Sequence, residues 1–251
     1  MLFYSFFQSV SSSDPSSLNG GSAMAMVGKD CVALAVDKRF GSGPQLINIS
    51  PRKVIPFHSH LLIAFTGLEG DVLSLSEELS IHVSNKFLSG SGIGYFNFLG
   101  RPSPNTNNNK RIINPKSISR LLSHLLYSKR SSPYYCEPLI VGLQPIIEKV
   151  ENNNDNDEIS EYTPFVCSQD VIGAQSITST FACCGVASNT MYGIAEAMWR
   201  PNLNPIELAK VCGKAFLLAL ERDCLSGYGA IVYVITKDEG ILEFDLVARD
   251  D

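Results

Sequence analysis

The chain of 251 residues is 45% hydrophobic, which is enough for a sizeable core and is most simply arranged as one domain. Its formal net charge of -5 is mild and gives no support for nucleic-acid binding, which favours a basic face. The seven cysteines form no CxxC pair, and most of them lie in apolar runs, a pattern typical of buried free thiols in a reducing compartment.

The first part of the chain predicts a set of strands. Met1–Phe7 is apolar but lacks the basic residues and the full apolar length of a signal peptide. No run approaches the ~18 apolar residues that a membrane helix needs, so we expect a soluble cytosolic protein without a membrane partner. Short apolar runs separated by Gly, Asp and Pro then predict strands over Ala23–Val27, Cys31–Val36 and Leu61–Phe65.

The middle of the chain predicts two helices and then strands again. Apolar residues recur at helical spacing over 68–83, where two acidic residues occupy the first turn, and again over 118–126. Short apolar runs predict three further strands, at Pro138–Leu143, Pro164–Cys167 and Thr180–Gly185.

The last part of the chain predicts two more helices and a closing hairpin. A third helical face covers 191–198, and a fourth helix begins at Pro205, because Asn204 can cap it and Glu207 completes a capping box. The fourth helix is expected to run to about Glu221. Two strands joined by a charged turn close the chain, at Gly229–Thr236 and Ile241–Val247.

This order of elements predicts an α+β fold. Strands and helices come in groups rather than alternating, which argues against repeated βαβ units. Several strands have no polar face, so both of their sides are expected to be covered. Two sheets packed together, with helices on the outside, satisfy both observations.

Two polar stretches do not fit a compact core. Ser89–Pro115 contains the asparagine-rich tract Asn105–Asn109, and Ile146–Glu161 contains the tract Asn152–Glu158. Such segments bury too little apolar surface to offset the cost of ordering them. Both are expected to be surface loops.

Three residues are spaced like an active-site framework. Asp37 ends the strand in Ala33–Arg39, Lys53 follows it by sixteen residues, and Gly21 precedes it by sixteen. This spacing resembles proteasome beta subunits, in which an aspartate and a lysine flank a threonine that autolysis exposes as the N-terminal residue. Here the nucleophile position holds glycine, which has no hydroxyl. The resemblance therefore implies a subunit that builds the particle without cutting peptides.

The resemblance extends along most of the chain. Further matching pieces occur in the order expected for the noncatalytic beta type-3 class, at Asn19–Met26, Gly28–Ala33, Thr66–Asp71, Pro133–Pro138 and Arg222–Gly227. The resemblance implies the four-layer αββα sandwich of N-terminal nucleophile hydrolases over residues 19–251. It makes residues 1–18 an N-terminal extension and the two polar stretches, near 89–115 and 146–161, surface insertions.

By the same resemblance, four side chains are the remnants of a catalytic site. In an active relative the terminal residue supplies the attacking hydroxyl, and its α-amino group, with a pKa of about 7.7–8.0, takes the proton. Asp37 and Lys53 keep the positions that assist this step, and Asp223 and Ser226 those of supporting polar groups. With Gly21 in place, the Asp37–Lys53 pair is interpreted as an element of the fold, because removing either partner would strand a charge.

Three further positions complete the expected site. Gly67 matches the residue whose amide faces the oxyanion in active relatives. Ser188 lies about two residues from the family's serine near the third helix and is interpreted as a helix N-cap. Ser22 could serve as the nucleophile of an active serine hydrolase, which we keep as the alternative function. Its spacing to Asp37 is one residue short, however, and on a strand this turns a side chain to the opposite face.

The resemblance also implies the partners. They are the other subunits of the 20S core particle: the beta type-2 and beta type-4 ring neighbours, the alpha ring and the opposite beta ring. The subunit would contribute to ring assembly, to the chamber wall and to the substrate pocket of beta type-2 in ubiquitin-dependent protein degradation, in cytoplasm and nucleus. No cofactor, metal or nucleic acid is expected. A stand-alone binding module on the same fold is the other alternative.

Overall fold

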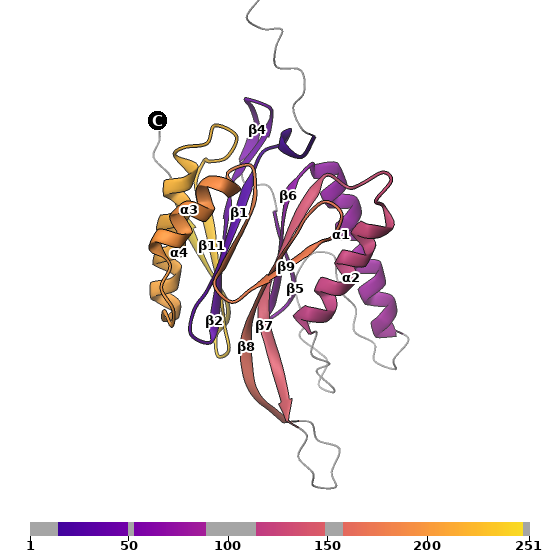
Figure 1. Cartoon of the computed structure of the whole chain (residues 1–251), viewed down its shortest axis with the longest axis vertical. Helices are drawn as coiled ribbons and strands as arrows, with labels where there is room; N and C mark the ends of the chain where they lie inside the picture. The colour runs from indigo at the N-terminus through magenta and orange to yellow at the C-terminus, as the bar shows by residue number, and fades with distance from the viewer. Residues whose placement is uncertain (1–14, 50–52, 89–113, 149–157, 248–251) are drawn as a thin grey trace, which may run out of the picture.

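The structure is a computed structural model that describes residues 15–49, 53–88, 114–148 and 158–247. Two five-stranded antiparallel sheets lie face to face, and a pair of helices covers the outer side of each (Figure 1). The predicted αββα sandwich is confirmed, and so is the predicted order of grouped strands and helices.

The first sheet carries the segments that surround Gly21. Its strand order is β10-β1-β2-β11-β12, and all neighbours are antiparallel. Helices α3 and α4 cover its outer face. The bounds of these elements are β1 Ser22–Val27, β2 Cys31–Asp37, β10 Phe181–Gly185, β11 Ala230–Thr236, β12 Gly240–Leu246, α3 Ser188–Met198 and α4 Pro205–Leu220.

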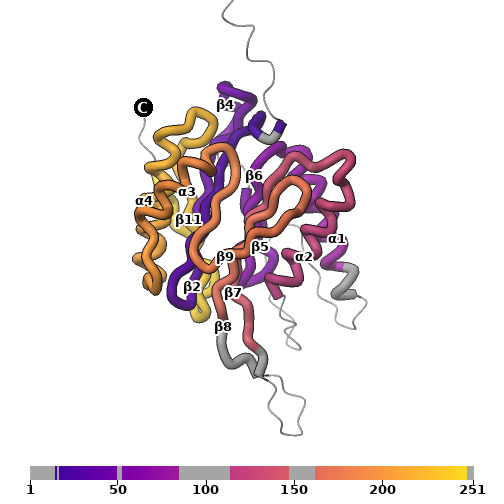
Figure 2. The backbone as a smooth tube through the Cα atoms, viewed as in Figure 1, coloured from indigo at the N-terminus to yellow at the C-terminus, as the bar shows by residue number. Residues whose placement is uncertain are grey.

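The second sheet has the strand order β5-β6-β7-β8-β9, and helices α1 and α2 cover its outer face. The bounds are β5 Val54–His58, β6 Leu61–Gly67, β7 Cys136–Glu148, β8 Glu158–Gln169, β9 Gln175–Thr178, α1 Glu69–Leu88 and α2 Pro115–Ser128. A separate hairpin of β3 Arg39–Ser42 and β4 Gln45–Ile49 follows β2, and β4 lies at the top of the molecule in Figure 2. A 3-10 helix at Pro15–Ser17 precedes β1.

Strand β2 explains why the layers hold together. All seven of its residues are buried, and the six before Asp37 alternate between two apolar clusters. Ala33 and Ala35 face α3 and α4, whereas Val32, Leu34 and Val36 face the other sheet. Successive side chains of a strand point to opposite faces, so a strand covered on both sides has no polar positions. Fully burying a side chain such as Leu34 contributes about 1.5–3 kcal/mol.

Several boundaries differ from the expectation. The loop predicted over Ile146–Glu161 is wrong at both ends, because β7 continues to Glu148 and β8 begins at Glu158, so that the two strands form one long hairpin. The backbone register pairs Ile147 with Ile159, beyond the predicted strands. Residues 149–157 and 89–113, which include Asn105–Asn109, lie outside the described residues.

The helix starts differ in detail. Ser188 is the first residue of α3 and Ala187 occupies the N-cap, so the interpretation of Ser188 as a cap is wrong. Asn204 is the N-cap of α4 and Pro205 starts the helix as predicted, but the Asn204 side chain makes no capping hydrogen bond. Within the described residues, no helix is both long and apolar enough to cross a membrane.

Candidate functional site

Strand pairing brings Gly21, Asp37 and Lys53 together. Gly21 directly precedes β1, Asp37 ends β2, and β1 and β2 pair so that Ala23 lies opposite Val36. This antiparallel register carries the start of β1 alongside the end of β2. Lys53 precedes β5 in the other sheet, and its Nζ forms an ion pair with Asp37 Oδ1. The structure therefore brings the three positions together.

The Asp37–Lys53 pair is buried between the sheets. Asp37 is 1% exposed and Lys53 is 7% exposed. Burial lowers the pKa of Lys53 below its usual value, because desolvation disfavours the ammonium, and the Asp37 carboxylate partly offsets this. Burial also raises the pKa of the nearby Glu69 carboxyl, against the effect of Lys53. The two opposite charges are therefore stabilised by each other rather than by water.

The backbone of Gly21 suits glycine and no other residue. Its φ of +96° lies in the left-handed region, where a side chain is strained. A Cβ at this position would lie 3.3 Å from Asp37 Oδ1 and would clash with Lys53 Nζ. Lys53 Nζ is the end of a flexible side chain that can shift, so the main obstacle to a side chain at this position is the positive φ.

Ser22 points away from Lys53, as its spacing predicts. Its Oγ lies 2.9 Å from Ser226 Oγ and accepts a hydrogen bond of 3.0 Å from the amide of Ala187. Its backbone N–H donates to Asp37 Oδ1 at 3.0 Å. Ser22 is fully buried, so both its hydroxyl and its amide serve the structure.

The other predicted site residues divide into two groups. Ser226 joins the site through Ser22, and the following amide of Gly227 donates to Asp37 Oδ2 at 3.4 Å. Asp223 instead accepts a hydrogen bond from the amide of Leu225 within its own loop. Asp223 therefore supports its own loop, through Leu225.

Gly67 ends β6 in pairing with Cys136 and has a φ of +114°. A Cβ there would lie 2.9 Å from Cys136 Cα and would clash with the carbonyl oxygen of Tyr135. Close approach of two strands therefore accounts for the glycine at this position.

Two residues that the sequence interpretation missed hold the segment before Gly21. Arg39 is 2% exposed and donates to the carbonyl oxygens of Leu225 at 3.0 Å and Gly43 at 2.6 Å. A Cβ on Gly41 would lie 2.6 Å from its guanidinium, so this fit requires glycine. The only signal in the sequence is the arginine directly after a buried strand, which by itself predicts a solvated turn.

Asn19 is the second missed residue. Its amide group donates to the carbonyl oxygen of Gly41 at 3.0 Å and its Oδ1 accepts from the amide of Glu69 at 3.0 Å, at the start of α1. The backbone adds bonds from Gly41 to the Asn19 carbonyl and from Gly43 to the Leu18 carbonyl. Leu18 and Asn19, upstream of Gly21, are thus built into the fold.

The seven cysteines are further candidate nucleophiles. Six cysteines are buried and Cys224 is exposed. Burial raises the pKa of the Cys136 and Cys212 thiols to about 12, which leaves them protonated and poorly nucleophilic. Among the described residues, no three His, Cys, Asp or Glu side chains are grouped so that they could hold a metal ion.

The comparisons with known proteins agree with this geometry. A family model described as proteasome subunit matches residues 17–89 and 158–235. The chain is 33% identical over 233 residues to proteasome subunit beta type-3 of Drosophila melanogaster, covering 93% of this chain and 97% of that protein. It is 34% identical over 239 residues to proteasome subunit beta type-3 of Saccharomyces cerevisiae, covering 95% and 100%. It is 36% identical over 225 residues to a probable proteasome subunit beta type-3 of Schizosaccharomyces pombe, covering 89% and 93%.

Proposed function

This chain belongs to the proteasome subunit family, and from that premise we propose that it is a noncatalytic structural beta subunit of the 20S core particle, in the place of beta type-3. Its role in protein degradation is then indirect: it completes the beta ring and forms part of the chamber wall. The match covers 97% of the Drosophila melanogaster protein and 100% of the Saccharomyces cerevisiae protein, which supports the assignment.

The observation that carries the noncatalytic assignment is the geometry at Gly21. Nucleophilic attack needs a hydroxyl or thiol within reach of a base. Gly21 has none, its φ is unfavourable for a side chain, and Lys53 Nζ lies beside it. The Asp37–Lys53 pair then serves to join the two sheets.

The alternative of an active serine hydrolase receives no support from Ser22. A nucleophile needs access to substrate, and Ser22 is fully buried. Its Oγ is committed to Ser226 and to the amide of Ala187. Activity would also require loss of Leu18, Asn19 and their neighbours, whose hydrogen bonds tie β3 and α1 to the site.

The finer part of the proposal concerns the neighbours. By family resemblance the subunit lies between beta type-2 and beta type-4, contacts the alpha ring and the opposite beta ring, and shapes the substrate pocket of beta type-2. Heterologous contacts between similar subunits close such a ring. We place the assembled particle in the cytoplasm and nucleus, which fluorescence microscopy of a tagged chain tests.

Native purification tests the assignment. A tagged full-length chain is purified under native conditions, and its partners are identified by mass spectrometry and native gel. We expect the chain in a particle with alpha and beta subunits, and beta type-2 and beta type-4 as its main crosslinked partners. A free monomer on size exclusion, with no subunits attached, would instead support a stand-alone binding module and overturn the proposal.

A further inference from the structure

Asn19 and Gly20 form the only Asn–Gly pair in the sequence, and they lie directly upstream of Gly21. In such a pair the backbone nitrogen of the glycine can attack the side-chain amide carbon of the asparagine, because glycine has no Cβ to hinder the approach. The pair is therefore a chemically labile point in the linking segment, residues 18–21, which joins the 3-10 helix to β1.

The fold requires the glycine of this pair. The backbone of Gly20 has a φ of +70°, in the left-handed region that favours glycine. A Cβ at this position would lie 2.7 Å from Arg39 Nη1 and would clash with the carbonyl oxygen of Leu225. The Arg39 guanidinium donates to that same carbonyl oxygen at 3.0 Å. A larger residue at position 20 would therefore disrupt a buried contact.

The fold also has a use for the asparagine. Asn19 Nδ2 donates to the carbonyl oxygen of Gly41 and its Oδ1 accepts from the amide of Glu69, both at 3.0 Å. An asparagine amide provides the donor and the acceptor that these two bonds need, whereas an ionised aspartate only accepts. Both members of the labile pair therefore have a structural reason.

The folded chain restrains both reacting groups. The amide N–H of Gly20 donates to the carbonyl oxygen of Ser17 at 3.1 Å, so the attacking nitrogen is engaged. The side-chain amide of Asn19, which contains the attacked carbon, is held between Gly41 and Glu69. Attack of one group on the other therefore competes with three hydrogen bonds that a released segment lacks.

The reaction needs only water. The Gly20 nitrogen loses its proton and forms a bond to Cγ of Asn19, the Cγ–Nδ2 bond breaks, and ammonia leaves with that proton. Water then opens the resulting succinimide ring at one of its two carbonyl carbons. Opening at Cγ leaves an aspartate at position 19. Opening at the main-chain carbonyl leaves an isoaspartate, whose backbone runs through Cγ.

Either product weakens the attachment of the linking segment. An aspartate carboxylate cannot donate to the Gly41 carbonyl oxygen and places a second acceptor against it. An isoaspartate adds the side-chain methylene to the backbone between two fixed points: the Leu18 carbonyl, which accepts from Gly43 at 2.8 Å, and the Gly21 amide, which donates to Leu225 at 3.1 Å. The longer backbone cannot keep both bonds in the same geometry.

We propose that Asn19 is a deamidation site that the fold keeps closed. The reaction takes place in chains whose linking segment is released, and the product prevents the segment from returning to Gly41 and Glu69. Deamidation thereby marks chains that have remained unfolded. The inference concerns the fold of this chain and does not depend on its partners.

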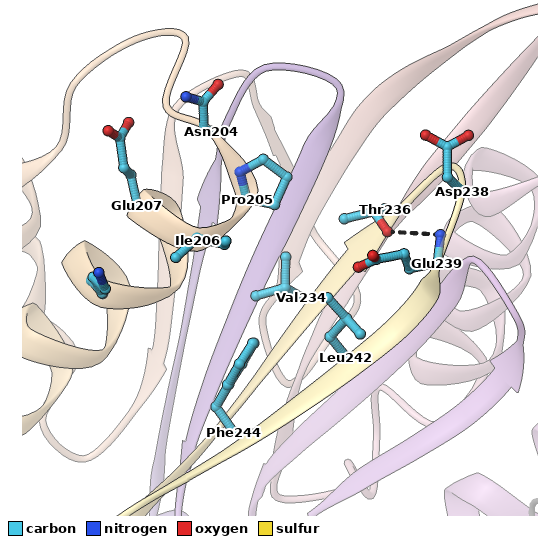
Figure 3. Close-up of a pocket in the computed structure, with 11 residues that line it drawn as sticks. Asn204, Pro205, Ile206, Glu207, Val234, Thr236, Asp238, Glu239, Leu242 and Phe244 are labelled. Carbon is cyan, nitrogen blue, oxygen red and sulfur yellow. Dashed lines mark hydrogen bonds between the residues drawn. The ribbon is translucent and has the colours of Figure 1, made fainter.

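Peptide mapping by mass spectrometry tests the closed state. The full-length chain, purified under native conditions, is incubated in mildly alkaline buffer with or without guanidinium chloride. We expect Asn19 to convert to aspartate and isoaspartate many-fold faster in the denaturant. Asn204 is an internal control, because it precedes Pro205 at the start of α4 (Figure 3) and proline has no N–H for the attack. Equal conversion of Asn19 in both buffers would overturn the inference.

A variant that opens the site without denaturant gives the second readout. A Cβ on Gly41 would lie 2.6 Å from the Arg39 guanidinium, so Gly41→Ala displaces a group beside the acceptor of Asn19. We expect Asn19 of this variant to deamidate several-fold faster than in the wild type under native conditions. Gly193→Ala, whose Cβ would meet nothing within 4 Å, is the matched control. The wild-type rate in both variants would mean that these contacts do not close the site, and the inference would be wrong.

Hydrogen exchange measures whether the product returns to its place. Asn19→Asp supplies one product directly, and Asn202→Asp makes the same charge change at an exposed residue. The amides of Gly41 and Gly43 donate to the carbonyl oxygens of Asn19 and Leu18 in the wild type. We expect these amides to exchange several-fold faster in Asn19→Asp and at the wild-type rate in Asn202→Asp. Wild-type exchange in Asn19→Asp would show that the product still holds the segment and would overturn the inference.

Discussion

Replacing Lys53 with methionine tests whether the Asp37–Lys53 pair is now a structural element. The substitution keeps most of the side-chain volume and removes the ammonium, leaving the Asp37 carboxylate at 1% exposure. Two backbone amides still face the carboxylate, those of Ser22 at 3.0 Å and Gly227 at 3.4 Å. Breaking a buried ion pair costs roughly 3–5 kcal/mol, and the remaining donors favour the lower end, about 3 kcal/mol.

A double variant gives this prediction its control. Lys53→Met combined with Asp37→Asn removes both charges, and the asparagine oxygen can still accept the amide of Ser22. We expect the double variant to be clearly more stable than Lys53→Met alone, because no charge is left buried without a partner.

Urea unfolding followed by tryptophan fluorescence measures both changes. Trp199 is the only tryptophan of the chain, and its indole N–H donates to the carbonyl oxygen of Val27 at 2.9 Å, so its signal reports the first sheet and its helices. A double variant that is as unstable as Lys53→Met, or less stable, would refute the reasoning. The loss would then come from packing around Lys53 rather than from a stranded charge.

Four further predictions can be tested on the same protein. Gly21→Thr is expected to lower assembly without creating an N-terminal nucleophile, because φ is +96° at this position and Lys53 Nζ lies beside it. Native gels measure the assembly and intact mass shows whether the chain is cleaved. A chain cut before residue 21 would contradict the prediction. In the folded chain at pH 8, iodoacetamide is expected to label Cys224 and spare the buried thiols, as peptide mapping can show. Above pH 9 the free energy of unfolding is expected to fall, because thiols of the unfolded chain ionise near pH 9 whereas Cys136 in the folded chain keeps its proton until about pH 12. Each such thiol lowers the free energy of unfolding by up to ~1.4 kcal/mol per pH unit. A free energy of unfolding that stays constant from pH 8 to 10.5 would disprove this. Deletion of Asn105–Asn109 is expected to leave assembly normal on a native gel, and loss of the particle would reveal a subunit contact there.

The layered fold could be predicted because its signals are local. Burial leaves a pattern in the sequence: a fully apolar strand at Cys31–Val36 and apolar residues at helical spacing over 68–83. The same burial decides which faces of these elements pack together. The short strands β3, β4, β5 and β9 gave no comparable signal. Strand β4 is exposed along its whole length, so its sequence carries no pattern of burial.

The site could be predicted only in part. Gly21, Asp37 and Lys53 were found because their spacing resembles the active-site framework of proteasome beta subunits, and the structure brings the three positions together. The contacts of Arg39 with Leu225 and of Asn19 with Glu69 join residues that are far apart in the chain, and neither leaves a pattern in the sequence. Their hydrogen bonds depend on how loops approach one another after the sheets have packed.

The helix boundary at Ser188 shows a different limit. A serine near a helix start favours the N-cap, yet Ala187 takes that position. The amide of Ala187 donates to Ser22 Oγ instead, so a tertiary contact decided where the helix begins. Local preference is weaker than a hydrogen bond that links two buried segments.

The N-terminus of the mature chain tests the central claim most directly. The particle is isolated, treated with an electrophilic inhibitor that labels N-terminal threonines, and each subunit is measured by intact mass and N-terminal sequencing. A structural subunit predicts a chain that retains residues upstream of Gly21 and carries no adduct, while catalytic subunits of the same particle are labelled. A chain that begins at Ser22 and carries the inhibitor would contradict the account.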